Sequence, residues 1–155
     1  TFSILGLKYL FKYFSIFRMI VEIISGLWIG DLNEFSNTQF MNDNLISVIL
    51  NCTLSHQVSS IDKRQHIRIP VSELNEPSSD FVLLKQNLGK IIHFIHTNID
   101  EKNICILGYN NFTIPLIICA IYIMKFGDIK KEMIMTILQS KYSRFTLDHD
   151  ISFFL

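Results

Sequence analysis

The sequence lacks the features that mark nucleic-acid-binding, disulfide-linked, metal-binding and membrane-spanning proteins. It carries no net charge, because 14 lysines and arginines balance 14 aspartates and glutamates, and it has no basic run. Nucleic acid is therefore not an expected partner, since its binding depends on a basic surface that neutralises phosphates. The sequence also shows no internal repeat and no linker. Its 155 residues indicate one domain with a sizeable core.

Disulfide and metal chemistry have little support either. Cys52, Cys105 and Cys119 each stand in an apolar run, and their spacing fits neither a disulfide framework nor a metal site. We expect reduced core thiols, which favours the cytoplasm or nucleus over secretion. His93 and His96 have a metal-compatible spacing, but without a third ligand nearby they are interpreted as surface histidines. No cofactor is expected.

A long uncharged hydrophobic run is also missing. Residues 1–18 are apolar and aromatic, but Lys8, Lys12 and Arg18 interrupt them, so they are too short and too charged for a membrane span. No small-residue cleavage site follows their apolar stretch. Two interpretations stay open: a fragment or non-native extension, or a helix that packs on a membrane surface or on a second copy. We separate this segment from a domain over residues 19–155.

Hydrophobic residues make up 49% of the chain and follow an alternation of strands and helices. Short apolar runs predict strands at residues 21–25, 27–30, 45–52, 66–70 and 104–107. Helical patterns cover residues 31–43, 81–95 with Ser79 as cap and Asp80 in the first turn, 115–125 and 128–140, and the tail from Leu147 forms a last short helix. This order predicts an α/β fold with a mixed, mostly parallel sheet and helices on both faces.

In such a sheet, ligands bind beyond the carboxyl ends of the strands. The loop from Gly108 to Ile114 joins a buried strand to a buried helix. We therefore expect the functional site there.

Five segments, in order, carry a resemblance to a known family. Residues 27–30 (LWIG) are similar to an opening "LYLG" strand, and residues 46–53 (ISVILNCT) to "ITHVLNCT". Residues 69–73 (IPVSE) stand where the family has "IPVxD", residues 103–108 (NICILG) where it has "NVLVHC", and residues 120–125 (AIYIMK) match "AYLMK". Over residues 21–155 the chain thus resembles the dual-specificity protein phosphatases, of the cysteine-based protein tyrosine phosphatase superfamily.

The family's reaction needs a histidine-cysteine pair, five loop residues and an arginine. The cysteine thiolate attacks phosphorus, successive loop N–H groups hold phosphoryl oxygens, and the arginine binds two of these oxygens as a bidentate fork. The resemblance leaves these roles vacant: Leu107 stands at the histidine, Gly108 at the cysteine, Asn111 at the loop glycine and Ile114 at the arginine. Glu73 stands at the general-acid aspartate. No catalytic residue is therefore expected in the loop.

A shifted register does not recover the site. With Cys105 as nucleophile the arginine would fall at Asn111, and no basic residue occurs between Lys102 and Lys125. Pro115 also replaces the hydroxyl residue that follows the arginine. Since loss of a covalent nucleophile typically costs about a million-fold in rate, we expect background activity.

Phosphate binding in the loop is expected to be weak or absent, because a helix N-terminus alone offers little affinity without the arginine. Candidate contacts for a protein partner are Tyr109, Asn110, Phe112 and Thr113. A plainer interpretation is that Leu107, Tyr109, Phe112 and Ile114 fill the former pocket.

The sequence thus predicts a pseudophosphatase, a protein-binding or regulatory module whose partner is a phosphatase substrate or regulator. Two alternatives stay open. One is a phosphatase-fold enzyme of altered chemistry that uses Glu73 with His56 or His66. The other is a structural protein that forms a homodimer or contacts a membrane through residues 1–18.

Overall fold

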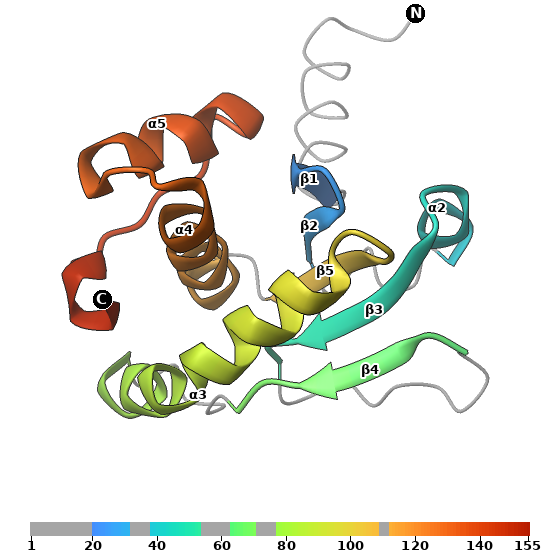
Figure 1. Cartoon of the computed structure of the whole chain (residues 1–155), viewed down its shortest axis with the longest axis horizontal. Helices are drawn as coiled ribbons and strands as arrows, with labels where there is room; N and C mark the ends of the chain where they lie inside the picture. The colour runs from blue at the N-terminus through green and yellow to red at the C-terminus, as the bar shows by residue number, and fades with distance from the viewer. Residues whose placement is uncertain (1–19, 32–37, 54–62, 71–76, 109–111) are drawn as a thin grey trace, which may run out of the picture.

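The computed structural model places the strands and helices of the domain in one α/β arrangement (Figure 1). It describes residues 20–31, 38–53, 63–70, 77–108 and 112–155. Several sequence predictions lie outside the described residues: the segment 1–18, His56, Glu73, Tyr109, Asn110 and Asn111.

A hairpin opens the sheet. Strands β1 (Ile20–Ile24) and β2 (Leu27–Asp31) pair antiparallel, as the two apolar runs predict. Gly26 forms the turn with a positive φ of 86°, and a Cβ there would lie 3.0 Å from the carbonyl oxygen of Ile99. Both the conformation and the close approach require glycine.

Three further strands run parallel to β2. They are β3 (Ile46–Asn51), β4 (Gln65–Arg68) and β5 (Asn103–Gly108), and the strand order across the sheet is β1-β2-β5-β3-β4. β3 and β5 are rich in isoleucine and almost wholly buried, as expected for central strands covered on both faces. The carboxyl ends of β3, β4 and β5 therefore meet at one edge of the sheet.

One face of the sheet carries the short helix α2 (Thr38–Asp43). Met41 of this helix packs into a small cluster with Ile46, Ile49, Cys105 and Leu107. The polar segment 31–43 thus contains the expected helix, but Asp31 belongs to β2 instead of the helix.

The other face carries the larger core and most of the helices. These are α3 (Pro77–Asn98), α4 (Thr113–Gly127), α5 (Lys131–Lys141) and the 3-10 turn η2 (Ile151–Phe154). Their apolar residues share one core cluster with this face of the sheet (Figure 1). Every residue of α4 from Pro115 to Ile123 is buried, which makes α4 the central helix of this layer. Among the described residues, no helix combines the length and apolarity of a membrane-spanning segment.

The sheet and its two helical layers confirm the fold class expected from the sequence. The prediction that Ser79 caps α3 is wrong. The helix begins at Pro77, so Ser79 lies inside its first turn together with Asp80. Proline suits a first helical position, because it lacks the N–H that would have no helical partner there and its φ is already close to the helical value.

Candidate functional site

The candidate site lies where β5 passes into α4, at the carboxyl edge of the sheet. Gly108 ends β5 and pairs with Asp31 of β2, while Phe112 precedes the first residue of α4. Phe112 has a positive φ of 53°, a left-handed conformation that is uncommon for an aromatic residue. Its carbonyl oxygen accepts the first helical hydrogen bond from the Leu116 N–H at 2.8 Å. The backbone therefore turns sharply into α4 at this point.

Pro115 occupies the space beside Gly108. A Cβ added at Gly108 would lie 2.5 Å from Cγ and 3.1 Å from Cδ of the proline ring, and real Cβ atoms essentially never come within 3.0 Å of such an atom. The ring cannot swing away as a long flexible side chain would, because it is closed on its own backbone. At the position that resembles the nucleophile, the ring fills the volume that a cysteine side chain would need.

The amino end of α4 is also a poor anion site. A helix holds an anion through the unpaired N–H groups of its first turn. The first three residues of α4 are Thr113, Ile114 and Pro115, and the proline has no N–H to donate. Asp31, the register partner of Gly108 in β2, is buried at this edge of the sheet. The missing N–H of Pro115 opposes the binding of phosphate.

The apolar residues at the start of α4 pack inward. Phe112 is only 8% exposed, and its ring meets that of Phe145 edge-to-face at a centroid distance of 6.1 Å. Ile114 is half-buried against the main core. These contacts bind the segment to the domain; a role for Phe112 or Thr113 in partner binding stays a prediction.

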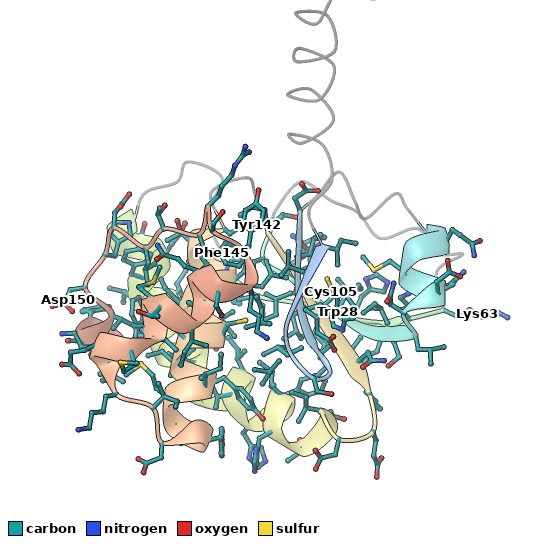
Figure 2. All side chains as sticks on the ribbon, turned by 90° about the horizontal axis from the view of Figure 1, so that it is seen from above. Trp28, Lys63, Cys105, Tyr142, Phe145 and Asp150 are labelled. Atoms are coloured by element: carbon teal, nitrogen blue, oxygen red, sulfur yellow. The ribbon has the colours of Figure 1, made fainter. Side chains whose placement is uncertain are left out.

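Side chains alternate along β5, so Cys105 and Gly108, the two positions considered for a catalytic cysteine, lie on opposite faces of the sheet. Cys105 and Leu107 point toward the α2 face, whereas Ile106 and Gly108 point toward α4. Figure 2 shows Cys105 close to Trp28, its register partner in β2. Burial raises the pKa of the Cys105 thiol to about 12. Cys105 is therefore a protonated thiol on the wrong face of the sheet for the loop that precedes α4.

The other two cysteines are equally unsuited to nucleophilic attack. Cys52 and Cys119 are buried free thiols, and burial, as the largest cause, raises the pKa of each well above its ordinary value. All three cysteines are thus core residues, as the sequence predicts.

His66, one of the two histidines considered for an alternative active site, does not face Gly108. His66 lies on β4 in register with Ile49, and Ile49 in turn pairs with Cys105. Paired residues of neighbouring strands point to the same face, so His66 lies on the α2 side. Gly108 points to the opposite side of the sheet.

The paired histidines of α3 lie on the surface. His93 and His96 are both exposed, and the ring of His96 stacks on Phe126 at 3.7 Å with an interplanar angle of 5°. Nδ1 of His96 also lies 3.4 Å from the hydroxyl oxygen of Tyr122. No cluster of three metal-ligating side chains occurs in the part of the chain that the structure describes.

Two features of the site have only a weak signal in the sequence. Asp31 is the first polar residue after an apolar run, which does not reveal that it is buried beside Gly108. Pro115 is visible as a departure from the family pattern, but its contact with Gly108 depends on how α4 packs on β5.

No protein-family model matches this chain, and no curated protein matches it in sequence. Solved structures do match. The structure is similar to human DUSP28 (TM-score 0.72, 12% identity, covering 86% of this chain and 87% of that protein) and to DUSP15 (0.71, 17%, 86% and 82%). It is also similar to the human tyrosine phosphatase-like serine/threonine/tyrosine-interacting protein (0.70, 12%, 87% and 90%). The chain therefore has the fold of the dual-specificity phosphatases.

Proposed function

We propose that this chain is a pseudophosphatase, a catalytically inactive protein with a dual-specificity phosphatase fold that binds a protein partner. The observation that carries the proposal is the contact between Gly108 and Pro115. The position corresponding to the nucleophile has no side chain, and the Pro115 ring leaves no room for one.

Two groups that phosphoryl transfer needs, the nucleophile and the arginine guanidinium, are missing from the loop. No basic residue occurs between Lys102 and Lys125, so no guanidinium arises from the loop itself to bind phosphoryl oxygens. Loss of a covalent nucleophile costs about a million-fold in rate, and loss of a charge-stabilising group about a hundred- to a thousand-fold, although the two effects are not additive. With both groups gone, hydrolysis should be indistinguishable from background.

A binding role agrees with the intact scaffold. The sheet and both helical layers are kept although the catalytic groups are not. One structural neighbour is named as a phosphatase-like interacting protein, which is the kind of role proposed here. The partner would be a substrate or regulator of active phosphatases. Three buried free thiols favour a reducing compartment, the cytoplasm or nucleus.

Hydrolysis of 4-nitrophenyl phosphate by purified protein at high concentration tests the proposal. The expected rate equals that of buffer, and it stays the same in a Glu73→Gln variant. Turnover by the folded protein that disappears in Glu73→Gln would show an enzyme of altered chemistry.

Phosphate binding gives a second, independent test. Thermal unfolding in millimolar inorganic phosphate should match unfolding in chloride at equal ionic strength, because a ligand that does not bind the folded state does not stabilise it. A midpoint that rises with phosphate concentration would contradict a degenerate loop.

A further inference from the structure

The carboxyl end of α5 carries positive charge. Lys141 is the last residue of α5 and Arg144 follows soon after it, and both side chains are exposed. Residues 133–147, which include both cations, contain no aspartate or glutamate. This stretch therefore adds two positive charges to the surface and no negative one.

The same end of α5 lies beside the start of the chain's first strand. α5 packs against β1, and Figures 1 and 2 show the end of α5 next to this strand. Ile20, the first residue of β1, pairs with Gly30 near the carboxyl end of β2. The ring of Phe145 meets that of Phe112 at the same edge of the sheet. Residues 1–18 are therefore joined to the domain on the side where α5 ends.

The composition of residues 1–18 adds to this positive charge. Eleven of the eighteen residues are aliphatic or aromatic, and the charged ones are Lys8, Lys12 and Arg18. The first acidic residue of the chain is Glu22. Apolar and aromatic side chains combined with lysine and arginine are typical of segments that bind the interface of an anionic membrane.

The two acidic residues of the hairpin do not offset these cations at the surface. Glu22 Oε1 accepts a hydrogen bond from the Gly26 N–H at 3.1 Å, which keeps its carboxylate at the turn, away from the start of β1. Asp31 is only 3% exposed, so it does not meet an approaching surface. The side of the domain where residues 1–18 are attached thus favours an anionic partner.

We propose that residues 1–18, together with Lys141 and Arg144, bind an anionic phospholipid membrane. The apolar and aromatic side chains would enter the boundary between headgroups and acyl chains, and the five cations would pair with the anionic headgroups. The carboxyl edge of the sheet would then face the membrane. The inference is independent of whether the degenerate loop is inactive.

A second copy of the chain is a poorer occupant by charge. A symmetric pair would bring the same five cations of each copy together. Residues 1–21 and 133–147 contain no acidic residue that could separate them. Like charges across such a contact oppose association, whereas an anionic membrane supplies the missing negative charge.

Cosedimentation of the full chain with phospholipid vesicles tests the proposal. Vesicles of phosphatidylcholine with phosphatidylserine are compared with vesicles of phosphatidylcholine alone. We expect binding to the anionic vesicles that weakens as sodium chloride is added, and much less binding to the neutral ones. Equal binding to both kinds of vesicle, or binding to neither, would overturn the proposal.

Charge reversals locate the binding surface. Lys8→Glu combined with Lys12→Glu should weaken binding to the anionic vesicles by about thirtyfold or more, because each cation at the membrane surface contributes about fivefold. Lys141→Glu combined with Arg144→Glu should weaken it by about tenfold. Unchanged binding in the second pair would show that the end of α5 takes no part.

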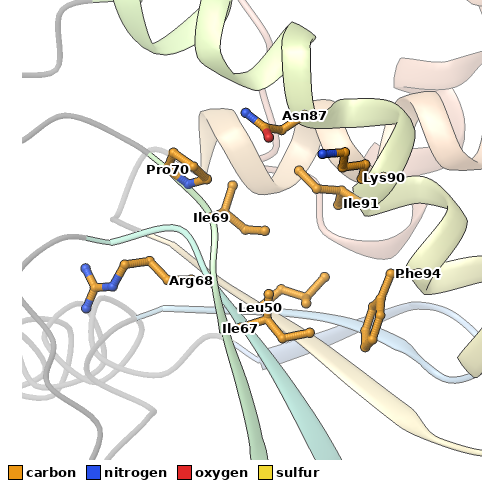
Figure 3. A pocket seen from close by; sticks show the side chains of 9 residues that line it. All are labelled: Leu50, Ile67, Arg68, Ile69, Pro70, Asn87, Lys90, Ile91 and Phe94. Atoms are coloured by element: carbon orange, nitrogen blue, oxygen red, sulfur yellow. The ribbon is translucent and has the colours of Figure 1, made fainter.

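The matched control lies at the other edge of the sheet. β4 is the edge strand opposite β1, and an apolar pocket of about 170 Å³ lies between β4 and α3 (Figure 3). Lys90 is exposed beside this pocket, and Lys102 is exposed just before β5. Lys90→Glu combined with Lys102→Glu makes the same change of net charge. It should leave vesicle binding within about twofold, because exposed charges more than about 8 Å away are screened.

Two further results would overturn the proposal. One is an equal loss of binding in the control pair, which would assign the binding to net charge alone. The other comes from sedimentation velocity without vesicles. A dimer of the original chain that becomes a monomer with Lys8→Glu and Lys12→Glu would make a second copy the occupant.

Discussion

The ring of Pro115 and the bare α-carbon of Gly108 fit together as one packed contact, because the ring lies where any side chain at 108 would begin. The position that resembles the family's nucleophile is therefore part of the structural core of this protein. The Pro115 ring can pack there only because residue 108 is a glycine.

This dependence is measurable as stability. Gly108→Ala should lower the free energy of unfolding by about 1–3 kcal/mol, because a methyl group is forced against a rigid ring. Adding Pro115→Ala should recover much of the loss, with a coupling free energy of about 0.5–3 kcal/mol. Urea denaturation of the four proteins in this cycle provides the values.

Gly89→Ala is the matched control. Gly89 lies in the interior of α3, and a Cβ there would meet nothing within 4 Å. The substitution should stabilise the protein by about 0.5–1 kcal/mol, because alanine is the better helix former. If Gly108→Ala is as well tolerated as Gly89→Ala, the contact with Pro115 is not as tight as described.

Restoring activity should require the proline as well as the catalytic groups. Gly108→Cys alone should stay at background, since it supplies a thiol without an arginine and without space. The combination Leu107→His, Gly108→Cys, Asn111→Gly, Ile114→Arg and Pro115→Ser should produce weak hydrolysis of 4-nitrophenyl phosphate. The same set with Pro115 retained should remain inactive. Activity from the single cysteine substitution would refute the assignment of the loop.

The native thiols should be unreactive. Burial raises the pKa of Cys105 to about 12 and also raises those of Cys52 and Cys119, so almost no thiolate exists at pH 8. Titration with Ellman's reagent should detect no fast-reacting thiol in the folded protein and all three in denaturant. A thiol that reacts rapidly before unfolding would indicate a cysteine open to chemistry.

The end of the chain should show a pH-dependent contact. Asp150 accepts a hydrogen bond from the Ser152 N–H at 2.9 Å and lies 3.3 Å from Nζ of Lys131. The hydrogen bond from Ser152 first, and Lys131 in addition, lower the pKa of this carboxyl below 3.8. A lowered pKa means that the contribution to stability is present above the unfolded value and is lost as the pH falls through the folded value.

Asp150→Ala should therefore lower the midpoint of thermal unfolding at pH 7, and the difference from the original protein should shrink as the pH falls below 3.8. Asp148→Ala, at a neighbouring exposed carboxyl, is the control and should have a smaller effect. An Asp150→Ala effect that is constant from pH 7 to pH 3 would assign the loss to packing instead of ionisation.

Most of the fold is predictable from local patterns. Continuous isoleucine-rich runs place β3 and β5, the apolar stripe places α3, and the order of strands and helices indicates the mixed sheet, because burial on both faces requires such runs. The first and last residues of a helix follow less directly from such patterns. The sequence favours Ser79 as a cap, but Pro77 already has the φ of a helix and begins α3 earlier.

By itself, the sequence determined that the loop after β5 contains neither a thiol nor a guanidinium, because residue identities need no coordinates. Only the tertiary structure decided that Pro115 fills the space beside Gly108, that Cys105 points toward α2, and that β4 and α3 enclose an apolar pocket. These relationships join residues from different elements. They depend on the distance and orientation at which the elements pack, which no local pattern specifies.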